Sequence, residues 1–246
     1  MLGIFQRAVL KPWMTMREIS LKGLAIGVAL ANPLAAADTR ETLRKRIGEA
    51  TEPRILFVGN SYSFKIPGVL RNLAQKEKKR IVVEKVTKGG WTLQKHAGSQ
   101  QTLGRIREAK WDVVVLQEQS QIPSFARAQR RNQMIPPAKI LVAEIRKSGA
   151  IPVFFQTWGR RDGDRQNSAA FPRDTFEKMQ ARLSEGYREA AEAAGGVLIV
   201  PVGEAWAKEM EAGRGRRLYA RDGSHPSADG VLHSARIFYH YLFGGE

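Results

Sequence analysis

The sequence contains no cysteine among its 246 residues, and it contains only four histidines. The absence of cysteine excludes disulfide bonds, thiolate metal sites and cysteine nucleophiles. The histidines form no H-E-x-x-H pair, so the sequence offers no zinc signature. We therefore expect no metal and no other cofactor, and any reactive groups should be hydroxyls, imidazoles and carboxylates.

Acidic residues are also scarce relative to basic ones. The chain has 24 Asp and Glu against 40 Lys and Arg, which gives a formal net charge of +16. Such an excess attracts nucleic acid, anionic lipid or acidic polysaccharide. The sequence shows no recognition helix, zinc finger or aromatic-rich RNA motif, and its basic runs are spread along the chain. We interpret the charge as a solvated basic surface and expect no nucleic-acid partner.

The first forty residues lack the run of about 20 apolar residues that a membrane span needs. A basic start is followed by a short apolar stretch at residues 24–30 and by an A-x-A cleavage site at residues 35–37. This is the pattern of a secretory signal peptide. We expect residues 1–37 to be removed and residues 38–246 to form one secreted or periplasmic domain with no integral membrane span. The alternatives are a retained anchor or a buried helix.

Along the rest of the chain, short apolar runs alternate with segments in which the apolar residues have helical spacing. Ser227 is a suitable N-cap for a last helix. One long helix is predicted over residues 92–110. Strands that alternate with helices indicate one α/β domain, a three-layer α/β/α sandwich on a mostly parallel, five-stranded sheet. Loops are expected at 118–136 and 158–170, after strands, where open α/β sheets place their sites. The predicted strands are residues 54–59, 81–87, 111–117, 150–158 and 197–202.

A candidate nucleophile follows the first predicted strand. Gly59-Asn60-Ser61 stands where the chain has to turn sharply from strand to helix. A serine there would present its hydroxyl at the carboxyl edge of the sheet, and its backbone N–H could help to bind a developing oxyanion. Glycine, asparagine and serine are also turn formers, so the tripeptide alone favours a turn with a helix cap.

A candidate base lies near the C-terminus, where Asp222 precedes His225 by three positions. At this spacing the carboxylate can accept a hydrogen bond from the imidazole Nδ1–H, which leaves the other nitrogen free to take a proton from Ser61. A neutral serine is a poor nucleophile and needs such a base. The three side chains together are therefore candidate catalytic residues, with a simple turn before a helix as the alternative explanation.

These motifs, in their order along the chain, resemble those of the SGNH (GDSL-like) hydrolases. F-V-G-N-S-Y-S matches the first block of the family, K-G-G-W-T-L the second and D-G-S-H-P-S-A-D-G the last, over roughly residues 54–243. The resemblance implies the SGNH, flavodoxin-like α/β/α fold and hydrolysis of an ester. It also implies an oxyanion hole that includes the backbone N–H groups of Ser61 and Gly90.

The third block departs from the family pattern. After the third predicted strand the chain reads V-V-L-Q-E-Q-S-Q-I-P, where the family normally has G-x-N-D. Some branches of the family resemble this chain in having L-Q-E-Q-S here. Alignment by strand end puts Gln119 at the asparagine position, and its amide can donate the same N–H from one methylene further out. Gln117 is the alternative if the register slips by two residues, and a third alternative is that neither glutamine contacts the substrate.

The sequence thus predicts a secreted or periplasmic serine esterase that works through an acyl-enzyme. Acetylated polysaccharide, a lipid ester and a small acyl ester all suit the same residues, although the basic loop 158–170 hints at an anionic substrate. The oligomeric state has no signature in the sequence. The alternative function is a non-catalytic module of the same fold that binds acidic glycans or anionic envelope surfaces.

Overall fold

The computed structural model describes residues 39–108 and 110–244. The predicted signal peptide, residues 1–37, lies outside this part of the chain. Among the described residues, no helix is both long enough and apolar enough to cross a membrane. The same residues contain no group of three or more His, Cys, Asp or Glu side chains placed to hold a metal ion.

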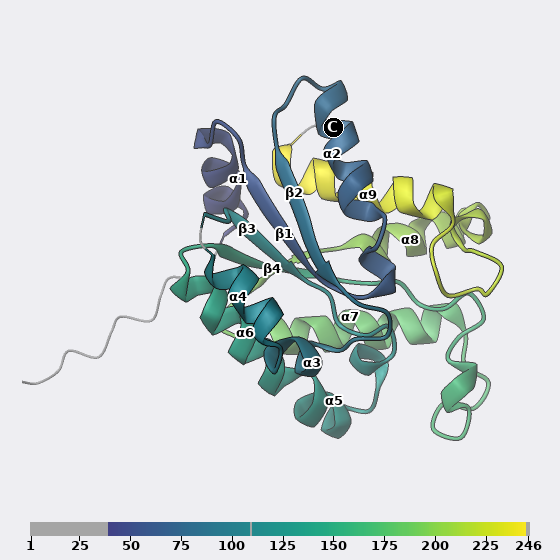
Figure 1. Cartoon of the computed structure of the whole chain (residues 1–246). Coiled ribbons are helices and arrows are strands. Elements are labelled where there is room, and N and C mark those ends of the chain that lie inside the picture. The colour runs from purple at the N-terminus through teal and green to yellow at the C-terminus, as the bar shows by residue number, and fades with distance from the viewer. Residues whose placement is uncertain (1–38, 109, 245–246) are drawn as a thin grey trace, which may run out of the picture. The chain divides into compact units, whose positions relative to one another are not determined.

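Helices and strands alternate along the described chain (Figure 1). Their order is α1 (Arg40–Glu49), β1 (Arg54–Gly59), the 3₁₀ helix η1 (Ser61–Ser63), α2 (Ile66–Lys76), β2 (Val82–Thr87), α3 (Leu93–Ala97), α4 (Gln100–Arg107), β3 (Val113–Leu116), η2 (Ile122–Ser124), α5 (Arg127–Gln133), α6 (Ile135–Lys147), β4 (Ile151–Phe155), η3 (Arg165–Asn167), α7 (Phe176–Ala193), β5 (Leu198–Val200), α8 (Val202–Glu211), η4 (Gly215–Leu218) and α9 (Ala228–Phe243).

The five strands form one sheet in the order β2-β1-β3-β4-β5, and every neighbouring pair is parallel. Phe57 of β1 pairs with Val115 of β3, which in turn pairs with Val153 of β4. This arrangement confirms the predicted five-stranded parallel sheet. Because all strands run the same way, the loops that follow β1, β2, β3 and β4 come out at one edge of the sheet.

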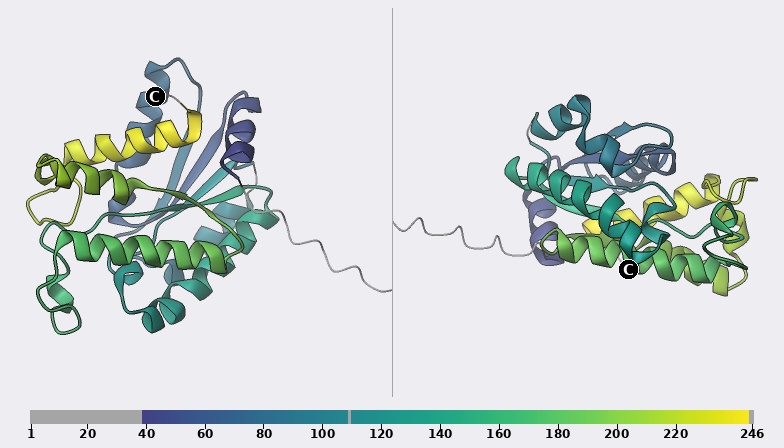
Figure 2. Two further views of the ribbon diagram at one scale, coloured as in Figure 1. Left: turned by 180° about the vertical axis from the view of Figure 1, so that it is seen from behind. Right: turned by 90° about the horizontal axis from the view of Figure 1, so that it is seen from below.

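The sheet is covered by helices on both faces, which confirms the three-layer prediction (Figure 2). Along β1, Ile55 and Phe57 belong to a core shared with α1, α2, α8 and α9. Leu56 and Val58 point to the other face and pack with α3, α4, α6 and α7. Burial on both faces explains why these strands read as continuous apolar runs in the sequence.

Three helical segments differ from the sequence prediction. The predicted helix 92–110 is two helices, because α3 ends at Ala97 with Gly98 as its C-cap, and the Ser99 side chain caps α4 by accepting from the backbone N–H of Thr102. The predicted loop 118–136 contains η2 and α5. Only Arg130 of α5 is buried, so this helix has no apolar stripe that a sequence pattern could reveal. Helix α8 was also not expected.

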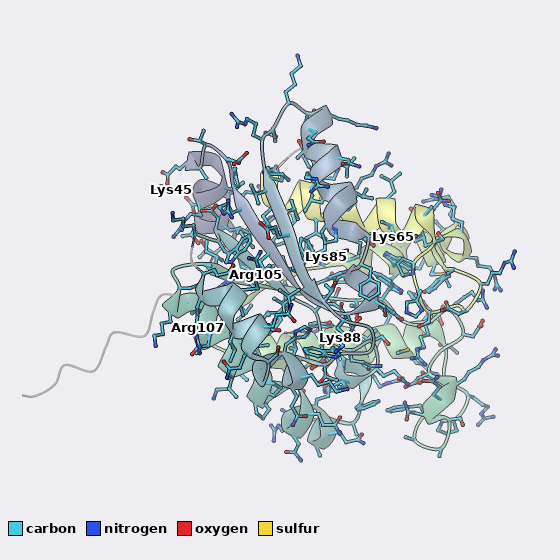
Figure 3. The ribbon with its side chains drawn as sticks, viewed as in Figure 1. Lys45, Lys65, Lys85, Lys88, Arg105 and Arg107 are labelled. Carbon is cyan, nitrogen blue, oxygen red and sulfur yellow. The ribbon has the colours of Figure 1, made fainter. Side chains whose placement is uncertain are left out.

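Basic side chains are distributed over several elements of the fold (Figure 3). Lys45 lies on α1, Lys85 on β2, and Arg105 on α4, where its guanidinium pairs with Glu84 and Glu108. This distribution agrees with the basic runs being spread along the sequence.

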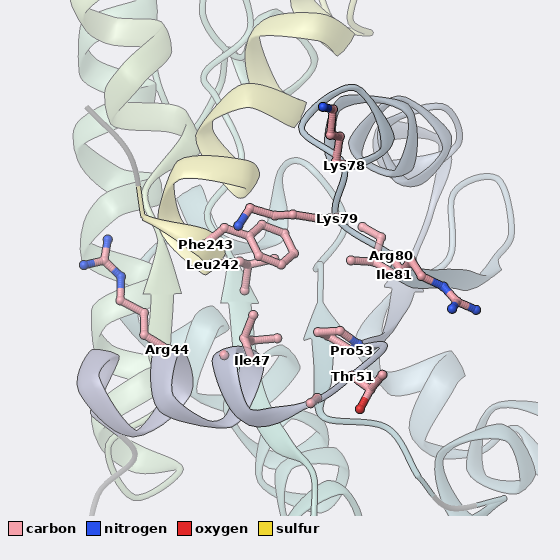
Figure 4. Close-up of a pocket in the computed structure, with 12 residues that line it drawn as sticks. Arg44, Ile47, Thr51, Pro53, Lys78, Lys79, Arg80, Ile81, Leu242 and Phe243 are labelled. Carbon is pink, nitrogen blue, oxygen red and sulfur yellow. The ribbon is translucent and has the colours of Figure 1, made fainter.

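A pocket of about 360 Å³ lies at the amino ends of β1 and β2, between α1 and the last turn of α9 (Figure 4). Its apolar lining includes Ile47, Leu242 and Phe243, and two basic residues, Arg44 and Lys79, also line it. This pocket is at the opposite edge of the sheet from the loops that follow the strands. It is therefore separate from the candidate site described next.

Candidate active site

The turn after β1 brings Ser61 to the carboxyl edge of the sheet. A Cβ at Gly59 would lie 2.6 Å from Gln117 Oε1, so only glycine fits at the end of this strand. Asn60 is extended, and its side-chain oxygen accepts a hydrogen bond from the backbone N–H of Tyr62 at 3.2 Å, which caps η1. Ser61 is therefore the first residue of a capped helical turn that leaves a close-packed strand.

Gln117 holds this turn from behind. Its Oε1 accepts from the backbone N–H of Asn60 and from the hydroxyl of Ser63, both at 2.9 Å, and its Nε2 donates to Asn60 Oδ1 at 3.0 Å. The side chain is fully buried. Gln117 is thus a positioning residue rather than a group that faces a substrate, a role that the sequence pattern did not indicate.

The turn before α9 brings His225 and Asp222 to Ser61. Ser61 Oγ lies 2.9 Å from His225 Nε2, and His225 Nδ1 lies 2.6 Å from Asp222 Oδ2. Asp222 Oδ1 also accepts from the backbone N–H groups of Ser224 and His225, each at 2.9 Å. The structure therefore joins the three predicted side chains in one chain of hydrogen bonds across a sequence separation of 164 residues.

Asp222 is held in its ionised form. Partial burial opposes its ionisation, but hydrogen bonds from the His225 ring and from the backbone N–H groups of Ser224 and His225 outweigh that effect and lower the pKa of the carboxyl. A charged carboxylate next to Nδ1 keeps the proton on that nitrogen. The Nε2 atom of His225 is then the one free to accept a proton from Ser61.

A small cavity of about 190 Å³ opens beside Ser61 and is lined also by Gly90, Gln119 and His225. Gly90 has a φ of +67°, a conformation that favours glycine. Among the described residues, no acceptor bonds to the backbone N–H of Ser61 or of Gly90. Two free N–H groups next to a hydroxyl form a suitable cradle for an oxyanion.

Gln119 lies at this cavity, whereas Gln117 does not. The Oε1 atom of Gln119 accepts from the backbone N–H of Gln121 at 2.8 Å, so the carbonyl end of the amide is anchored. Its Nε2 makes one long hydrogen bond of 3.4 Å, to Gln121 Oε1. Of the two glutamines considered from the sequence, only Gln119 can offer an N–H to the cavity.

Two titratable groups are buried behind the cavity. His96 is fully buried, and its ring bonds to the Gly59 carbonyl and to the Thr102 hydroxyl, both at 2.9 Å, so its role is structural and burial lowers its pKa. Glu118 Oε1 accepts from the backbone N–H groups of Leu93 at 3.0 Å and Gln119 at 2.6 Å. Burial raises the pKa of Glu118 to about 7.

An aromatic stack supports the His225 turn. Trp158 is fully buried between Tyr62, at a ring distance of 4.7 Å, and Trp206, at 3.9 Å. The Tyr62 hydroxyl lies 2.6 Å from Ser224 Oγ, and Trp158 Nε1 donates to the Ser224 carbonyl at 3.0 Å. These contacts tie the residue before His225 to the turn that begins at Ser61. In the sequence, Trp158 is the last residue of the predicted strand 150–158.

No protein-family model matches the sequence, and no curated protein matches it. Solved structures do match. One is a protein from Slackia heliotrinireducens described as an SGNH hydrolase. It matches with a TM-score of 0.64 and 27% sequence identity, and the match covers 78% of this chain and 99% of that chain. A DUF4886 family protein from Bacteroides uniformis matches with a TM-score of 0.68 and 18% identity, over 79% of this chain and 84% of that chain. The acetylxylan esterase Axe2 from Geobacillus stearothermophilus matches with a TM-score of 0.60 and 16% identity, over 80% of this chain and 97% of that chain.

The chain has the SGNH hydrolase fold. Within this SGNH fold, Ser61 follows β1, Gly90 follows β2, Gln119 follows β3, and His225 precedes α9. All four line the same cavity. Four separate segments of the sequence therefore converge at the carboxyl edge of the sheet, where open α/β folds bind their ligands.

Proposed function

We propose that this SGNH-fold chain is a serine esterase in which Ser61 is the nucleophile, His225 the general base and Asp222 its orienting acid. The observation that supports the proposal most directly is the pair of short contacts, 2.9 Å from Ser61 Oγ to His225 Nε2 and 2.6 Å from His225 Nδ1 to Asp222 Oδ2. A serine hydroxyl with an imidazole on one side and free N–H groups on the other suits acyl transfer.

In the first step, Ser61 Oγ attacks the ester carbonyl carbon while its proton passes to His225 Nε2. The electron pair of the carbonyl double bond moves onto the oxygen, which the N–H groups of Ser61 and Gly90 and the Gln119 amide stabilise. Collapse of this tetrahedral species breaks the bond to the alcohol, and the alcohol leaves with the proton from His225. Asp222 stabilises the imidazolium throughout.

In the second step, water replaces the alcohol. His225 takes a proton from the water as the oxygen attacks the acyl carbon on Ser61, and it returns a proton to Oγ when the acid leaves. Every proton moves between Ser61, His225, the alcohol and water, so no residue outside this group is needed for the transfer. Together with the predicted signal peptide, the proposal describes a secreted or periplasmic esterase.

Aryl ester hydrolysis by paired serine variants tests the proposal. Ser61→Ala should lower kcat for 4-nitrophenyl acetate by at least about 10³-fold, because the nucleophile is lost while the fold remains. Ser148→Ala removes a serine hydroxyl that bonds to the Ile145 carbonyl after α6, at the opposite edge of the sheet, and should keep the rate. Full activity in purified Ser61→Ala would show that the proposal is wrong.

A further inference from the structure

A second and larger cavity, of about 440 Å³, adjoins the candidate active site. The two cavities share Arg160, Ser224 and His225 in their walls. The larger one continues past Asp222 and Gly223 into the loop that follows β4. The candidate active site therefore opens into a space that is large enough for a substrate group beyond the ester itself.

Arg160 stands at the junction of the two cavities with most of its donors unused. Its Nη1 donates to Gln166 Oε1 at 2.9 Å. Its Nε is buried and has no hydrogen-bond partner, and no acceptor among the described residues bonds to Nη2. A free guanidinium N–H group can bind a carboxylate or a phosphate by a charge-assisted hydrogen bond, and Nη2 is the group left for one here, because Nε is enclosed by the protein.

The nearest carboxylate does not satisfy Arg160. Asp164 Oδ1 is 3.7 Å from Arg160 Nη1, beyond hydrogen-bond distance. Asp164 is fully buried, and its two oxygens accept instead from Gln121 Nε2 at 2.8 Å and from Asn167 Nδ2 at 2.7 Å. The carboxylate thus moderates the charge of Arg160 but leaves its donors free.

The other two arginines of the larger cavity already have a partner. Arg161 donates from Nε and Nη2 to Asp162 Oδ2 at 3.3 and 3.1 Å, and Arg165 lies 3.9 Å from the same oxygen. The hydrogen bond from Arg161 is the main cause of the lowered pKa of Asp162, so this carboxylate stays charged and occupies Arg161. The Arg165 side chain is 80% exposed and is held by no hydrogen bond from the described residues, whereas the Arg160 side chain is only 16% exposed. Among the described arginines of this cavity, Arg160 is therefore the one that combines unused donors with a sheltered position at the junction.

The backbone around Arg160 is fixed relative to the turn that carries His225, because the Arg161 N–H donates to the Gly223 carbonyl at 2.8 Å. The Gly159 carbonyl accepts from the Tyr219 hydroxyl at 2.7 Å, and the Gly159 N–H donates to Gln180 Oε1 at 2.8 Å. A Cβ at Gly159 would meet the Phe176 carbonyl at 2.9 Å, so the chain is packed closely here. A guanidinium on such a rigid segment can fix the orientation of a substrate.

The residues that line only one of the two cavities indicate which half of the ester each cavity would hold. The oxyanion donors Gly90 and Gln119 line only the small cavity, whereas Asp222 lines only the large one, behind His225. His225 gives its proton to the departing alcohol, so the alcohol lies on the histidine side of the site. The large cavity is therefore the alcohol side.

We propose that the ester cleaved at Ser61 has an anionic group, a carboxylate or a phosphate, on its alcohol part, and that the guanidinium of Arg160 binds it. The inference rests on the proposed esterase function and adds the substrate class to it. Arg160 acts here as a specificity residue. The small cavity holds the acyl group, and its volume of about 190 Å³ suits a short acyl chain.

Two matched pairs of esters test this assignment. On the alcohol side, 3-acetoxybenzoate is compared with its neutral analogue 3-acetoxybenzamide. On the acyl side, the phenyl monoester of succinic acid is compared with the phenyl ester of succinamic acid. The quantity measured is the ratio of kcat/KM within each pair, at about 0.15 M salt to screen distant charges.

The wild-type chain should favour 3-acetoxybenzoate over the amide by about 10- to 100-fold, as expected for hydrogen bonds to a charged group. Arg160→Gln should bring this ratio to about 1. Arg160→Lys should retain an intermediate preference, because lysine keeps the positive charge but lacks the planar guanidinium group and its fixed N–H donors. Arg80→Gln removes an equal charge from a side chain that is 79% exposed and lies at the opposite edge of the sheet, so it should change the ratio by less than about 2-fold.

Two results would overturn the inference while leaving the esterase proposal intact. One is hydrolysis of all four esters with an alcohol-side ratio near 1 in the wild-type chain, which needs no variant to fold. The other is a preference confined to the acyl-side pair. Absence of any hydrolysis that depends on Ser61 would overturn both the esterase function and the assignment of Arg160.

Discussion

Replacement of the buried Glu118 by glutamine should change how the stability of the chain depends on pH. Glu118 is fully buried, and its Oε1 accepts the backbone N–H groups of Leu93 and Gln119. No described group bonds to Oε2. Burial raises the pKa of the Tyr187 phenol on α7, and the charge of Glu118 adds to that effect. A glutamine keeps the acceptor oxygen and cannot ionise.

The size of the effect follows from the pKa of Glu118. Burial raises it to about 7 in the folded chain, against 4.5 for an ordinary glutamate, which corresponds to about 3 kcal/mol. Because the folded state binds the proton more tightly, this contribution to stability is complete below pH 4.5 and is lost as the pH rises through 7. The unfolding free energy of the wild type should thus fall, relative to Glu118→Gln, across that interval.

Urea unfolding followed by tryptophan fluorescence gives the free energy of unfolding of both proteins at pH 4.5, 6 and 8. The variant should gain up to about 3 kcal/mol on the wild type between the lowest and the highest pH. Glu49→Gln, at a glutamate with a side chain that is 67% exposed, controls for the loss of one negative charge. A difference between wild type and Glu118→Gln that stays constant with pH would refute the reasoning.

Three further substitutions test the candidate site. Asp222→Asn should lower kcat by about 10²- to 10⁴-fold, because the imidazolium loses its carboxylate partner; a loss below 3-fold would contradict its role. Gln119→Ala should lower kcat by about 10²-fold, and an unchanged rate would remove it from the oxyanion hole. Gln117→Leu leaves the Asn60 N–H and the Ser63 hydroxyl without their acceptor, so it should lower the unfolding free energy by about 1–3 kcal/mol per group in a urea titration. Unaltered stability would show that this buried network is not needed.

The sheet could be predicted from the sequence because its central strands β1, β3 and β4 are buried on both faces. A short valine-rich run such as residues 111–117 is typical of a strand of this kind. The fourth strand was predicted to reach residue 158 but ends at Phe155. The next three residues, Gln156, Thr157 and Trp158, are as buried as the strand itself, so no change from buried to exposed positions marks the end of the strand.

The proximity of Ser61 and His225 could be inferred because both stand at turns next to regular elements. The support around them could not be inferred. Gln117 bonds to Asn60 across 57 residues of sequence, and no local pattern distinguishes such a buried glutamine from one on a surface. Arg160 was similarly one basic residue among many, and only the side-chain contacts show that Asp164 leaves its donors unused.

Covalent labelling with a fluorophosphonate tests the central claim most directly. The reagent phosphonylates a serine only when a neighbouring base activates the hydroxyl, so the mass of each proteolytic peptide reports which serine is reactive. The account predicts one adduct, on Ser61, and strongly reduced labelling in His225→Ala. No adduct on the folded wild-type chain, or an adduct on a different serine, would contradict it.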